Sequence, residues 1–432
     1  MGTRLWRTGI QHRFLFTRLV RAAAAAIVTS ATLFGVPLQA HAEPSVGVQF
    51  HATWTNYTDS ERIAVLDKLA AAGVQWVRID LGWGSFEGGA KGKLDQWYFQ
   101  VSDQAIDAAN ARGIKVLGTF WRTPKWANGG GKATDPPSDP ADYADFARCA
   151  SAHFRGRVSA WEVWNEPNLK YFWSGANPAR YAALVRAAYP AFKAGDPDAP
   201  VVAGSVSKND TPWLERMYAA GIAGSFDVLS THPYQDPPDA APETADDGRI
   251  GNLDHIRAVH DLMSAQGDEA KPIWATEFGW SSSSKHGGVT EERQADYLVR
   301  ALRVFADRHP YVTNVFWYNE RATGPGDAQN SGYGLLRRDL SEKPAYGALK
   351  EALVPEVGSQ PALPAPTLGA GLPPARDTRD LQSCLQEAAR QRPVSTAPKS
   401  PRRGLGLGVG AGVGLLLGIG LWRYRARVRA SR

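Results

Sequence analysis

Glu166 and Glu277 each follow or end a short apolar run that has the character of a buried β-strand. The runs are residues 158–164 and 272–277. Two carboxyl groups that flank one bond can break it, because a protonated carboxyl donates a proton to the leaving oxygen while an ionised one attacks the adjacent carbon. We therefore take Glu166 as the candidate acid/base and Glu277 as the candidate nucleophile.

The neighbours of the two candidates favour opposite protonation states. Arg78, His232 and Tyr234 are candidate partners that would keep Glu277 ionised and oriented. Glu166 lies among tryptophans and a proline, an apolar setting that favours the protonated form. If the carboxyl groups are separated by about 5–5.5 Å, the reaction is expected to retain the configuration at the attacked carbon.

The segments that would carry these residues alternate between strand and helix patterns. Eight short apolar or β-branched runs indicate strands, at residues 46–51, 74–80, 114–120, 158–164, 201–205, 226–232, 272–277 and 314–318. Apolar residues at the 3.6-residue period of a helix lie between them, most clearly in residues 60–72 and 291–308. Asp139 followed by Pro140 is typical of a helix start.

This alternation predicts a parallel sheet that helices cover on both faces. Eight repeats predict an α/β fold of the closed (β/α)8 type, a TIM barrel, over residues 44–353. An open, doubly wound sheet is the alternative. It would need a glycine-rich phosphate loop after the first strand, and residues 46–56 contain none.

Active sites of such barrels lie at the C-terminal ends of the strands, and polar or aromatic residues gather there in this sequence. In strand order they are His51, Arg78, Asp80, Asn165, Glu166, His232, Tyr234, Glu277, Trp317, Tyr318 and Asn319. Taken singly, a strand-end histidine is usually a structural residue and a lone glutamate a solvated one. Several independent strand ends with such groups favour a functional site.

Two motifs resemble those of a known enzyme group. WEVWNEPN at residues 161–168 is similar to the Asn-Glu-Pro acid/base motif of clan A glycoside hydrolases, and ATEFGW at residues 275–280 to their strand-seven nucleophile motif. The likeness extends over nearly all of residues 45–350 and is closest to families 39 and 5, including bacterial exopolysaccharide and xylosidase-type glycosidases. It implies a retaining glycosidase that cleaves a polysaccharide or oligosaccharide by double displacement, with no cofactor and no metal.

The resemblance also implies roles for residues around the pair. Arg78 would contact the nucleophile, and His232 and Tyr234 would support it. Asn165 would bind the 2-hydroxyl of the sugar in the −1 subsite, which is the sugar that is attacked. The remaining expected substrate contacts are Trp317 as an aromatic platform under that sugar, with His51 and Trp121 as further subsite residues.

The sequence contains 15 Trp, 14 Tyr and 15 Phe, and flat aromatic rings often line sugar subsites. Tyr171, Trp173, Trp126 and Trp280 lie in predicted loops and are candidates for outer subsites. Packing between loops explains them equally well.

Three other glutamates compete with the chosen pair. Glu320 follows the eighth strand, Glu87 follows the second and Glu162 lies within the fourth. We rank them lower because none combines a strand end with a matching motif.

The two ends of the chain carry its excess of positive charge. Residues 1–42 and residues 423–432 hold five arginines each and no acidic residue, so a formal charge of +6 for the chain becomes −4 for residues 43–422. A mildly acidic body argues against nucleic-acid binding, which needs a basic patch on the folded domain. The basic start, the apolar residues 22–36 and the sequence Ala40-His41-Ala42 predict a signal peptide over residues 1–42.

The C-terminal region predicts a membrane anchor. Residues 354–403 are rich in Pro, Ala, Ser and Arg and are expected to form a linker, with one short helix around residues 379–390. Residues 404–422 are long and apolar enough to cross a bilayer, and residues 423–432 would form a basic cytoplasmic tail. We therefore expect a monomeric catalytic domain on the outer face of the cell membrane.

Cys149 and Cys384 fit no metal-binding spacing. They could form a disulfide in an oxidising compartment or remain two free thiols.

Two other functions remain open from the sequence. One is a catalytically inactive barrel that binds a glycan. The presence of both glutamates argues against this function. The other is a transglycosylase, which uses the same residues and accepts a sugar in place of water.

Overall fold

The computed structural model describes residues 43–285, 287–324, 328–354, 373–374 and 376–393. The predicted signal peptide, the predicted span at residues 404–422 and the basic tail lie outside these residues, as does much of the predicted linker. Among the residues that are described, no helix combines the length and the apolar character needed to cross a bilayer.

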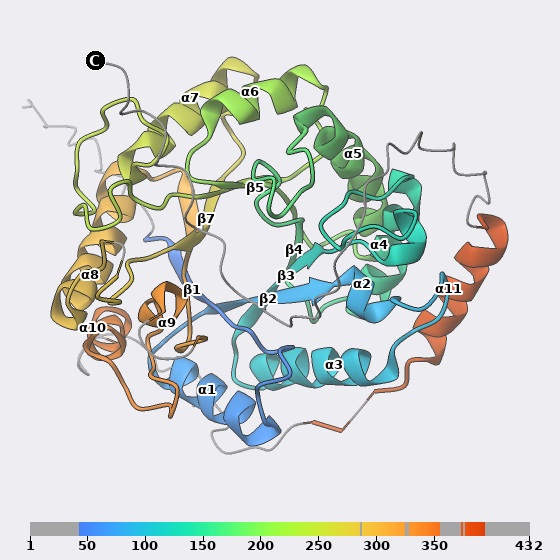
Figure 1. Ribbon diagram of the computed structural model, residues 1–432, viewed down its shortest axis with the longest axis horizontal. Coiled ribbons are helices and arrows are strands. Elements are labelled where there is room, and N and C mark those ends of the chain that lie inside the picture. The colour runs from blue at the N-terminus through green and yellow to red at the C-terminus, as the bar shows by residue number, and fades with distance from the viewer. Residues whose placement is uncertain (1–42, 286, 325–327, 355–372, 375, 394–432) are drawn as a thin grey trace, which may run out of the picture. The chain divides into compact units, whose positions relative to one another are not determined.

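Eight parallel strands close into a barrel in chain order, with β1 paired to both β2 and β8 (Figure 1). This confirms the predicted (β/α)8 barrel and excludes the open sheet. The strands are β1 (Ser45–Gln49), β2 (Trp76–Gly82), β3 (Lys115–Trp121), β4 (Ala160–Val163), β5 (Val201–Ser207), β6 (Val228–His232), β7 (Ile273–Phe278) and β8 (Val312–Trp317).

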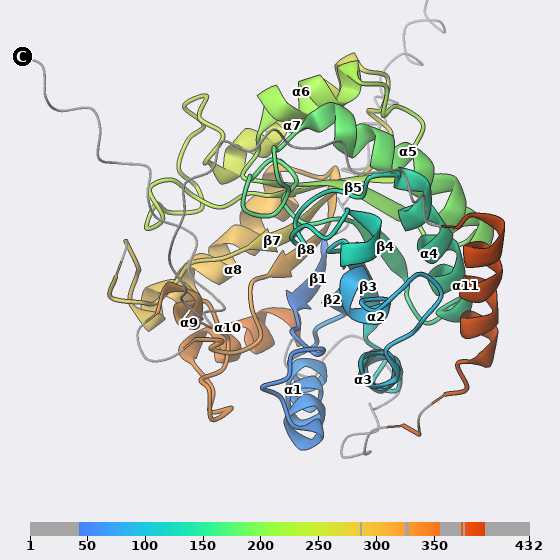
Figure 2. The same cartoon turned by 45° about the vertical axis from the view of Figure 1, so that its right-hand side comes forward.

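Helices surround the barrel (Figures 1 and 2). They are α1 (Asp59–Ala71), α2 (Trp83–Phe86), α3 (Gln96–Asn110), α4 (Pro140–His153), α5 (Pro178–Gly195), α6 (Thr211–Ala219), α7 (Ile256–Ala265), α8 (Glu291–Arg308), α9 (Gln329–Gly332), α10 (Pro344–Leu353) and α11 (Arg379–Gln391), with short 3-10 turns at η1 (Lys125–Ala127) and η2 (Leu253–His255).

Side-chain caps explain where several of these helices begin. Asp139 accepts a hydrogen bond from the backbone of Ala141 and Pro140 occupies the first turn of α4, as predicted. At the start of α1, Thr58 and Glu61 form a reciprocal capping box.

The interior of the barrel is apolar at its base and polar above. One buried side chain from each of strands β2 to β8 forms the basal cluster: Trp76, Leu117, Ala160, Val202, Val228, Trp274 and Phe316. At Gly47 of β1, an added Cβ would lie 2.4 Å from the Phe316 ring, so the glycine leaves room for that ring. The packed base closes the end of the barrel that lies opposite the C-terminal ends of the strands, where active sites of such barrels are found.

Helix α11 packs on the outside of α4 (Figure 2). Leu381 and Leu385 are buried at this contact, and a disulfide joins Cys384 of α11 to Cys149 of α4. The side chain of Gln382 also donates a hydrogen bond to the carbonyl of Gly92. The structure therefore selects the disulfide over two free thiols, and the helix expected within the linker is docked on the barrel.

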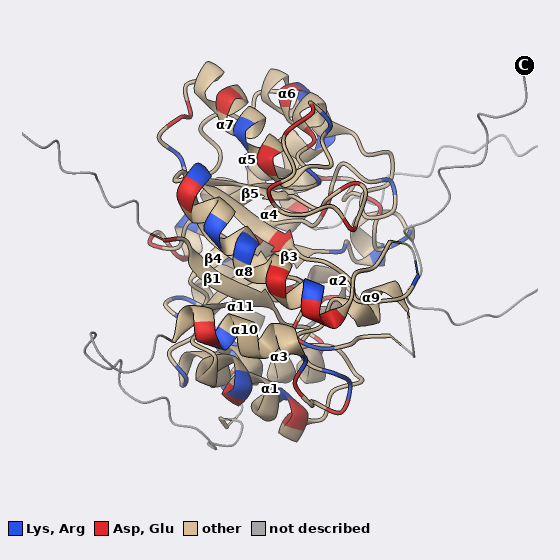
Figure 3. Ribbon diagram, turned by 90° about the vertical axis from the view of Figure 1, so that its left-hand side faces the viewer, with Lys and Arg blue, Asp and Glu red and all other residues tan. Residues whose placement is uncertain are grey.

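Basic and acidic residues are interspersed along the helices of the side shown in Figure 3. On α8, for example, Arg300 pairs with Asp296 and with Glu243.

Candidate active site

Glu166 and Glu277 lie at neighbouring positions in the barrel mouth. Glu277 is the fifth residue of β7, and Glu166 follows β4, where its backbone N–H donates to the carbonyl of Ser205 on β5. One oxygen of each carboxyl group and a ring nitrogen of His232 all lie within 4.8 Å of one another. The two carboxyl groups are therefore close enough to act on one bond, at a spacing nearer to that of retaining than of inverting enzymes.

Arg78 of β2 connects the residues under the mouth. Its guanidinium is buried and donates to Glu277 Oε1 at 2.6 Å, to Glu162 Oε2 at 2.7 Å and to Asn165 Oδ1 at 2.7 Å. It also donates to Gln49 Oε1 at 2.7 Å. The expected contact between Arg78 and the candidate nucleophile is present, and the planar guanidinium fixes the position of four other side chains.

Glu162 is the buried counter-charge of Arg78. It is fully buried and accepts further hydrogen bonds from Thr119 at 2.8 Å and Ser230 at 3.1 Å. Burial alone would raise the pKa of Glu162, but the charges of Arg78 and His232, together with side-chain hydrogen bonds, outweigh it and lower that pKa. Glu162 therefore stays ionised beneath the mouth and supports Arg78. This role could not be predicted, because Arg78 lies 84 residues earlier in the chain.

His232 and Tyr234, at and after the end of β6, contact both candidates. Tyr234 donates its hydroxyl hydrogen to Glu277 Oε2 at 2.9 Å. The Nδ1 atom of His232 lies 3.1 Å from Glu166 Oε1 and 3.7 Å from Glu277 Oε2. The resemblance placed His232 with the nucleophile alone, whereas the structure places it between the two carboxyl groups and nearer to Glu166.

Charge explains how these partners are ionised. Burial disfavours the charged form of His232, but Glu277 and Glu166 outweigh that effect and raise its pKa. Burial, and then the charge of Glu277, raises the pKa of Tyr234 well above its usual value. Tyr234 therefore remains a hydrogen-bond donor to Glu277 throughout the neutral pH range.

Asn165 lies directly before the candidate acid/base. Its Oδ1 atom accepts the hydrogen bond from Arg78, so its Nδ2 atom is directed elsewhere. Within the described part of the chain, no side chain or carbonyl accepts a hydrogen bond from Nδ2. The amide can thus donate to a sugar hydroxyl, as the resemblance implied.

His51 at the end of β1 is held by Glu320. The Nδ1 atom of His51 lies 3.0 Å from Glu320 Oε2, and the hydroxyl of Tyr57 donates to Glu320 Oε1 at 2.7 Å. Burial disfavours the charged form of each, but their attraction raises the pKa of His51 and lowers that of Glu320. Glu320 is fully buried, so it orients His51 and does not compete with Glu166 and Glu277.

Trp317 does not form the expected platform, and this prediction is corrected. The side chain is fully buried, donates to the carbonyl of Tyr333 at 3.0 Å and packs against Phe278 on the helical side of the sheet. Successive side chains of a strand point to opposite faces. The next residue, Tyr318, faces the mouth instead, where its half-buried ring lies 5.8 Å from the ring of His51. Tyr318 is the aromatic side chain that can contact a sugar from β8.

The other aromatic candidates, at the end of β3 and in the loops after β4 and β7, have mixed outcomes. Trp121 is half-buried at the end of β3, with its ring 5.9 Å from that of Phe172 in the loop after β4. Tyr171 is 56% exposed and remains a candidate for an outer subsite. Trp173 and Trp280 are buried, so they pack between loops and contact no substrate.

Glu87 is separate from the candidate pair. It is buried in the loop between α2 and α3, where it accepts hydrogen bonds from Trp83 at 2.9 Å and from the backbone of Gly92. Burial raises the pKa of Glu87 to about 7. Its carbonyl accepts a hydrogen bond from Trp126, which ties that candidate subsite residue to the loop.

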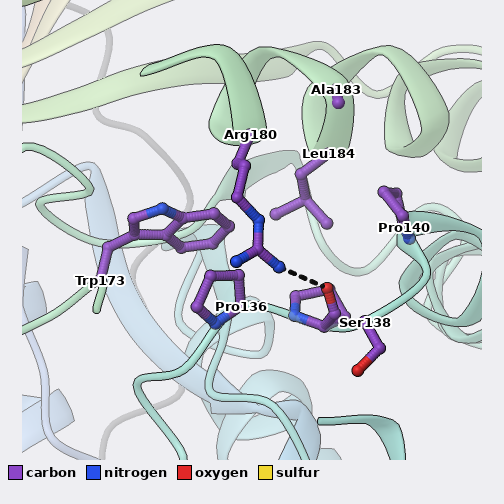
Figure 4. A pocket seen from close by; sticks show the side chains of 8 residues that line it. Pro136, Ser138, Pro140, Trp173, Arg180, Ala183 and Leu184 are labelled. Carbon is purple, nitrogen blue, oxygen red and sulfur yellow. Dashed lines mark hydrogen bonds between the residues drawn. The ribbon is translucent and has the colours of Figure 1, made fainter. Parts of the chain in front are cut away.

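Two other possible sites carry less chemistry. The group Glu166, His232 and Glu277 has the ligand spacing of a metal site, but Arg78 and Tyr234 already donate hydrogen bonds to Glu277. A cavity between α4 and α5 is shown in Figure 4, where Arg180 donates to the carbonyl of Pro137. Trp173 is the one lining residue that the sequence suggested for an outer subsite, and neither Glu166 nor Glu277 lines this cavity.

Comparison with known proteins supports the same chemistry. The family model for cellulases (glycosyl hydrolase family 5) matches residues 37–322. A β-xylosidase of Geobacillus stearothermophilus is 25% identical over 289 residues, which cover 60% of this chain and 56% of the relative. The chain thus spans little more than half the length of this relative.

Solved structures of glycoside hydrolases share the fold. A family 39 glycoside hydrolase from the gut symbiont Bacteroides cellulosilyticus WH2 has a TM-score of 0.59 and 27% identity, over 72% of this chain and 64% of that one. A GH5_18 protein from Streptomyces cattleya, solved with GlcNAc, has a TM-score of 0.57 and 19% identity, over 72% of this chain and 80% of that one. The likeness to the second structure concerns the fold alone.

Proposed function

This chain belongs to glycosyl hydrolase family 5, and from that premise we propose that it hydrolyses O-glycosidic bonds with retention of configuration. Glu277 is the proposed nucleophile and Glu166 the proposed acid/base. The observation that carries the proposal is the approach of these two carboxyl groups to within 4.8 Å, with His232 between them.

The proposed reaction has two displacements. In the first, the Glu277 carboxylate attacks the anomeric carbon while Glu166 donates its proton to the glycosidic oxygen, and the leaving sugar departs as an alcohol. In the second, Glu166 takes a proton from water, the water oxygen attacks the same carbon, and the bond to Glu277 breaks. The proton ends on Glu166 and the enzyme is restored.

The surrounding groups support this division of labour. The hydrogen bonds from Arg78 and Tyr234 stabilise charge on Glu277. Among the described residues, no arginine or lysine pairs with Glu166, whose carboxyl group contacts His232. The free amide of Asn165 is the proposed donor to the 2-hydroxyl, and the Tyr318 ring is the proposed platform.

The proposed substrate is a β-linked polysaccharide or oligosaccharide. This rests on the likeness to the β-xylosidase of Geobacillus stearothermophilus. We also propose that the enzyme acts outside the cell and is held at its membrane by residues 404–422. The disulfide supports export, because such bonds persist in oxidising compartments.

The first test is hydrolysis of a panel of 4-nitrophenyl β-glycosides and polysaccharides by residues 43–393. Glu277→Ala should abolish turnover, and azide should restore it with formation of the α-glycosyl azide, because azide then takes the place of the nucleophile. Glu215→Ala, at an exposed position on α6, is the matched control and should remain active. Wild-type turnover by Glu277→Ala would refute the assignment.

The second test separates the two glutamates. Glu166→Ala should still release 2,4-dinitrophenol from an activated glycoside in a rapid burst, because this leaving group needs no proton. Azide should accelerate the slow second step and give the β-glycosyl azide. If the wild-type protein binds glycans but cleaves none of the panel, it is a binding scaffold. If sugar-to-sugar products predominate in water, it is a transglycosylase.

A further inference from the structure

Three tyrosines form a cluster beside Glu277, and the proposed mechanism uses only two of them. The ring centroids of Tyr234, Tyr318 and Tyr333 are 5.6 to 6.5 Å apart, and each pair meets edge to face. Tyr234 and Tyr318 are half-buried, whereas Tyr333 is 9% exposed. Tyr333 directly follows α9, in the long segment between β8 and α10.

Tyr333 also borders the backbone next to the proposed nucleophile. A Cβ atom added at Gly279, two residues after Glu277, would lie 3.3 Å from Cδ1 of the Tyr333 ring. The carboxylates of Glu277 and Glu166 both act electrostatically on the Tyr333 hydroxyl, and burial together with these charges raises the pKa of Tyr333 to about 12. The phenol therefore stays neutral in the field of both carboxyl groups.

The loops after β7 and β8 interlock behind this ring. The carbonyl of Gly332 accepts hydrogen bonds from the backbone of Ser282 at 3.1 Å, from Gln294 Nε2 at 2.8 Å and from Lys343 Nζ at 2.8 Å. A Cβ atom at Gly332 would lie 2.1 Å from Oγ of Ser281, so only glycine fits there. These contacts fix the backbone that carries Tyr333.

The contact between Lys343 and the Gly332 carbonyl requires the burial of an ammonium group, which is unfavourable. The Lys343 side chain is 4% exposed and donates to Ser282 Oγ and to the Gly332 carbonyl, both at 2.8 Å. No carboxylate pairs with it within the described ranges. Burial lowers the pKa of Lys343 to about 8, so the ammonium form is disfavoured in the folded protein. A methionine of similar length would avoid that cost.

We propose that Tyr333 forms a third aromatic wall of the sugar-binding site and that Lys343 is the positioning residue that holds this wall against Tyr234 and Tyr318. The inference rests on the proposed glycosidase function. It adds a substrate contact from the β8 loop and explains why a charged side chain is buried where no reaction takes place.

The test uses the 4-nitrophenyl β-glycoside that the wild-type protein hydrolyses best. Tyr333→Ala should lower kcat/KM by about 10- to 100-fold, mainly through KM, because an ordered wall is lost. Tyr333→Phe should stay within about 3-fold of wild type, since the ring makes the contact. Equal kcat/KM for Tyr333→Ala and wild type would overturn the role of the wall.

Lys343→Met distinguishes positioning from structural support. It should lower kcat/KM in the same direction as Tyr333→Ala, while Tm stays equal or rises because a buried charge is removed. In the Tyr333→Ala background, Lys343→Met should cause less than about a 2-fold further loss, because both changes act through one ring. Lys350→Met, at an exposed position of α10, is the matched control.

Two results would overturn the positioning role. One is a lower Tm for Lys343→Met with unchanged kcat/KM, and the other is full additivity of the two substitutions. If no glycoside of the panel is hydrolysed by the wild-type protein, the proposed function fails instead, so the two failures are distinct.

Discussion

Replacing Arg78 by methionine should destabilise the protein and should do so most strongly at neutral pH. The substitution removes the guanidinium that contacts Glu162, Glu277 and Asn165. Glu162 is fully buried, and an uncompensated buried charge costs about 3–5 kcal/mol. For a domain of this size, that corresponds to a decrease in Tm of roughly 5–10 °C.

The pH dependence follows from the sign of the shift at Glu162. In the wild type Arg78 lowers the pKa of Glu162, so this group adds stability above the pKa of the unfolded chain and loses it as the pH falls through the folded value. Without Arg78, burial raises that pKa, and the carboxyl group opposes folding at neutral pH. The stability difference between Arg78→Met and wild type should therefore shrink as the pH falls towards about 4.

Thermal unfolding of four proteins tests this reasoning: wild type, Arg78→Met, Glu162→Gln and the double variant. The double variant should regain about half of the stability lost in Arg78→Met, because the buried charge of Glu162 is removed while Glu277 still lacks Arg78. It should stay inactive on the glycoside panel, since Glu277 and Asn165 still lack their partner. A double variant that is no more stable than Arg78→Met, or a loss that does not change with pH, would refute the account.

Three further predictions concern other parts of the structure. Replacing Cys149 and Cys384 by serine should lower the free energy of unfolding by up to about 5 kcal/mol, given a sequence separation of 235 residues, with kcat/KM unchanged; denaturant unfolding measures it. Tyr318→Ala should lower kcat/KM at least 10-fold with little change in Tm, whereas Trp317→Ala should cost about 3–5 kcal/mol of stability because that side chain is buried. Gly279→Ala should lower kcat/KM, because its Cβ would lie 2.9 Å from the Tyr318 carbonyl oxygen. Steady-state kinetics measures this loss, and thermal unfolding should give a Tm within about 5 °C of wild type.

The barrel could be predicted from the sequence because its signals are local. Each strand is a short apolar run and each helix has its own period and caps, so the eight strands and α1, α4 and α8 lie within a few residues of their expected positions. The positions of Glu166 and Glu277 followed from the same rule, since strand ends meet at the mouth.

Other features depend on contacts between distant segments. Arg78 and Glu162 meet only when β2 to β4 are in register, so the sequence could not reveal that Glu162 supports Arg78. The aromatic platform was predicted at Trp317 and not at Tyr318 for a different reason. At the end of β8, an error of one residue reverses the face of the sheet on which a side chain lies.

The docking of α11 was missed for a third reason. The segment is short and is rich in polar residues, with Leu381 and Leu385 as its main buried side chains. A sequence pattern shows that such a helix has one apolar edge, but it does not show which surface covers that edge. The disulfide between Cys149 and Cys384 identifies α4 as that surface, and this pairing is seen only in the structure.

The bond between Cys149 and Cys384 changes how force and proteolysis would act on the chain. A pull applied beyond residue 393 would reach the barrel through α4, not through α10, although α10 precedes the C-terminal segment in the chain. A protease that cut between residues 355 and 372 would leave both fragments covalently joined. Separation of the barrel from the segment that begins at residue 373 would then need a reductant as well as a cut.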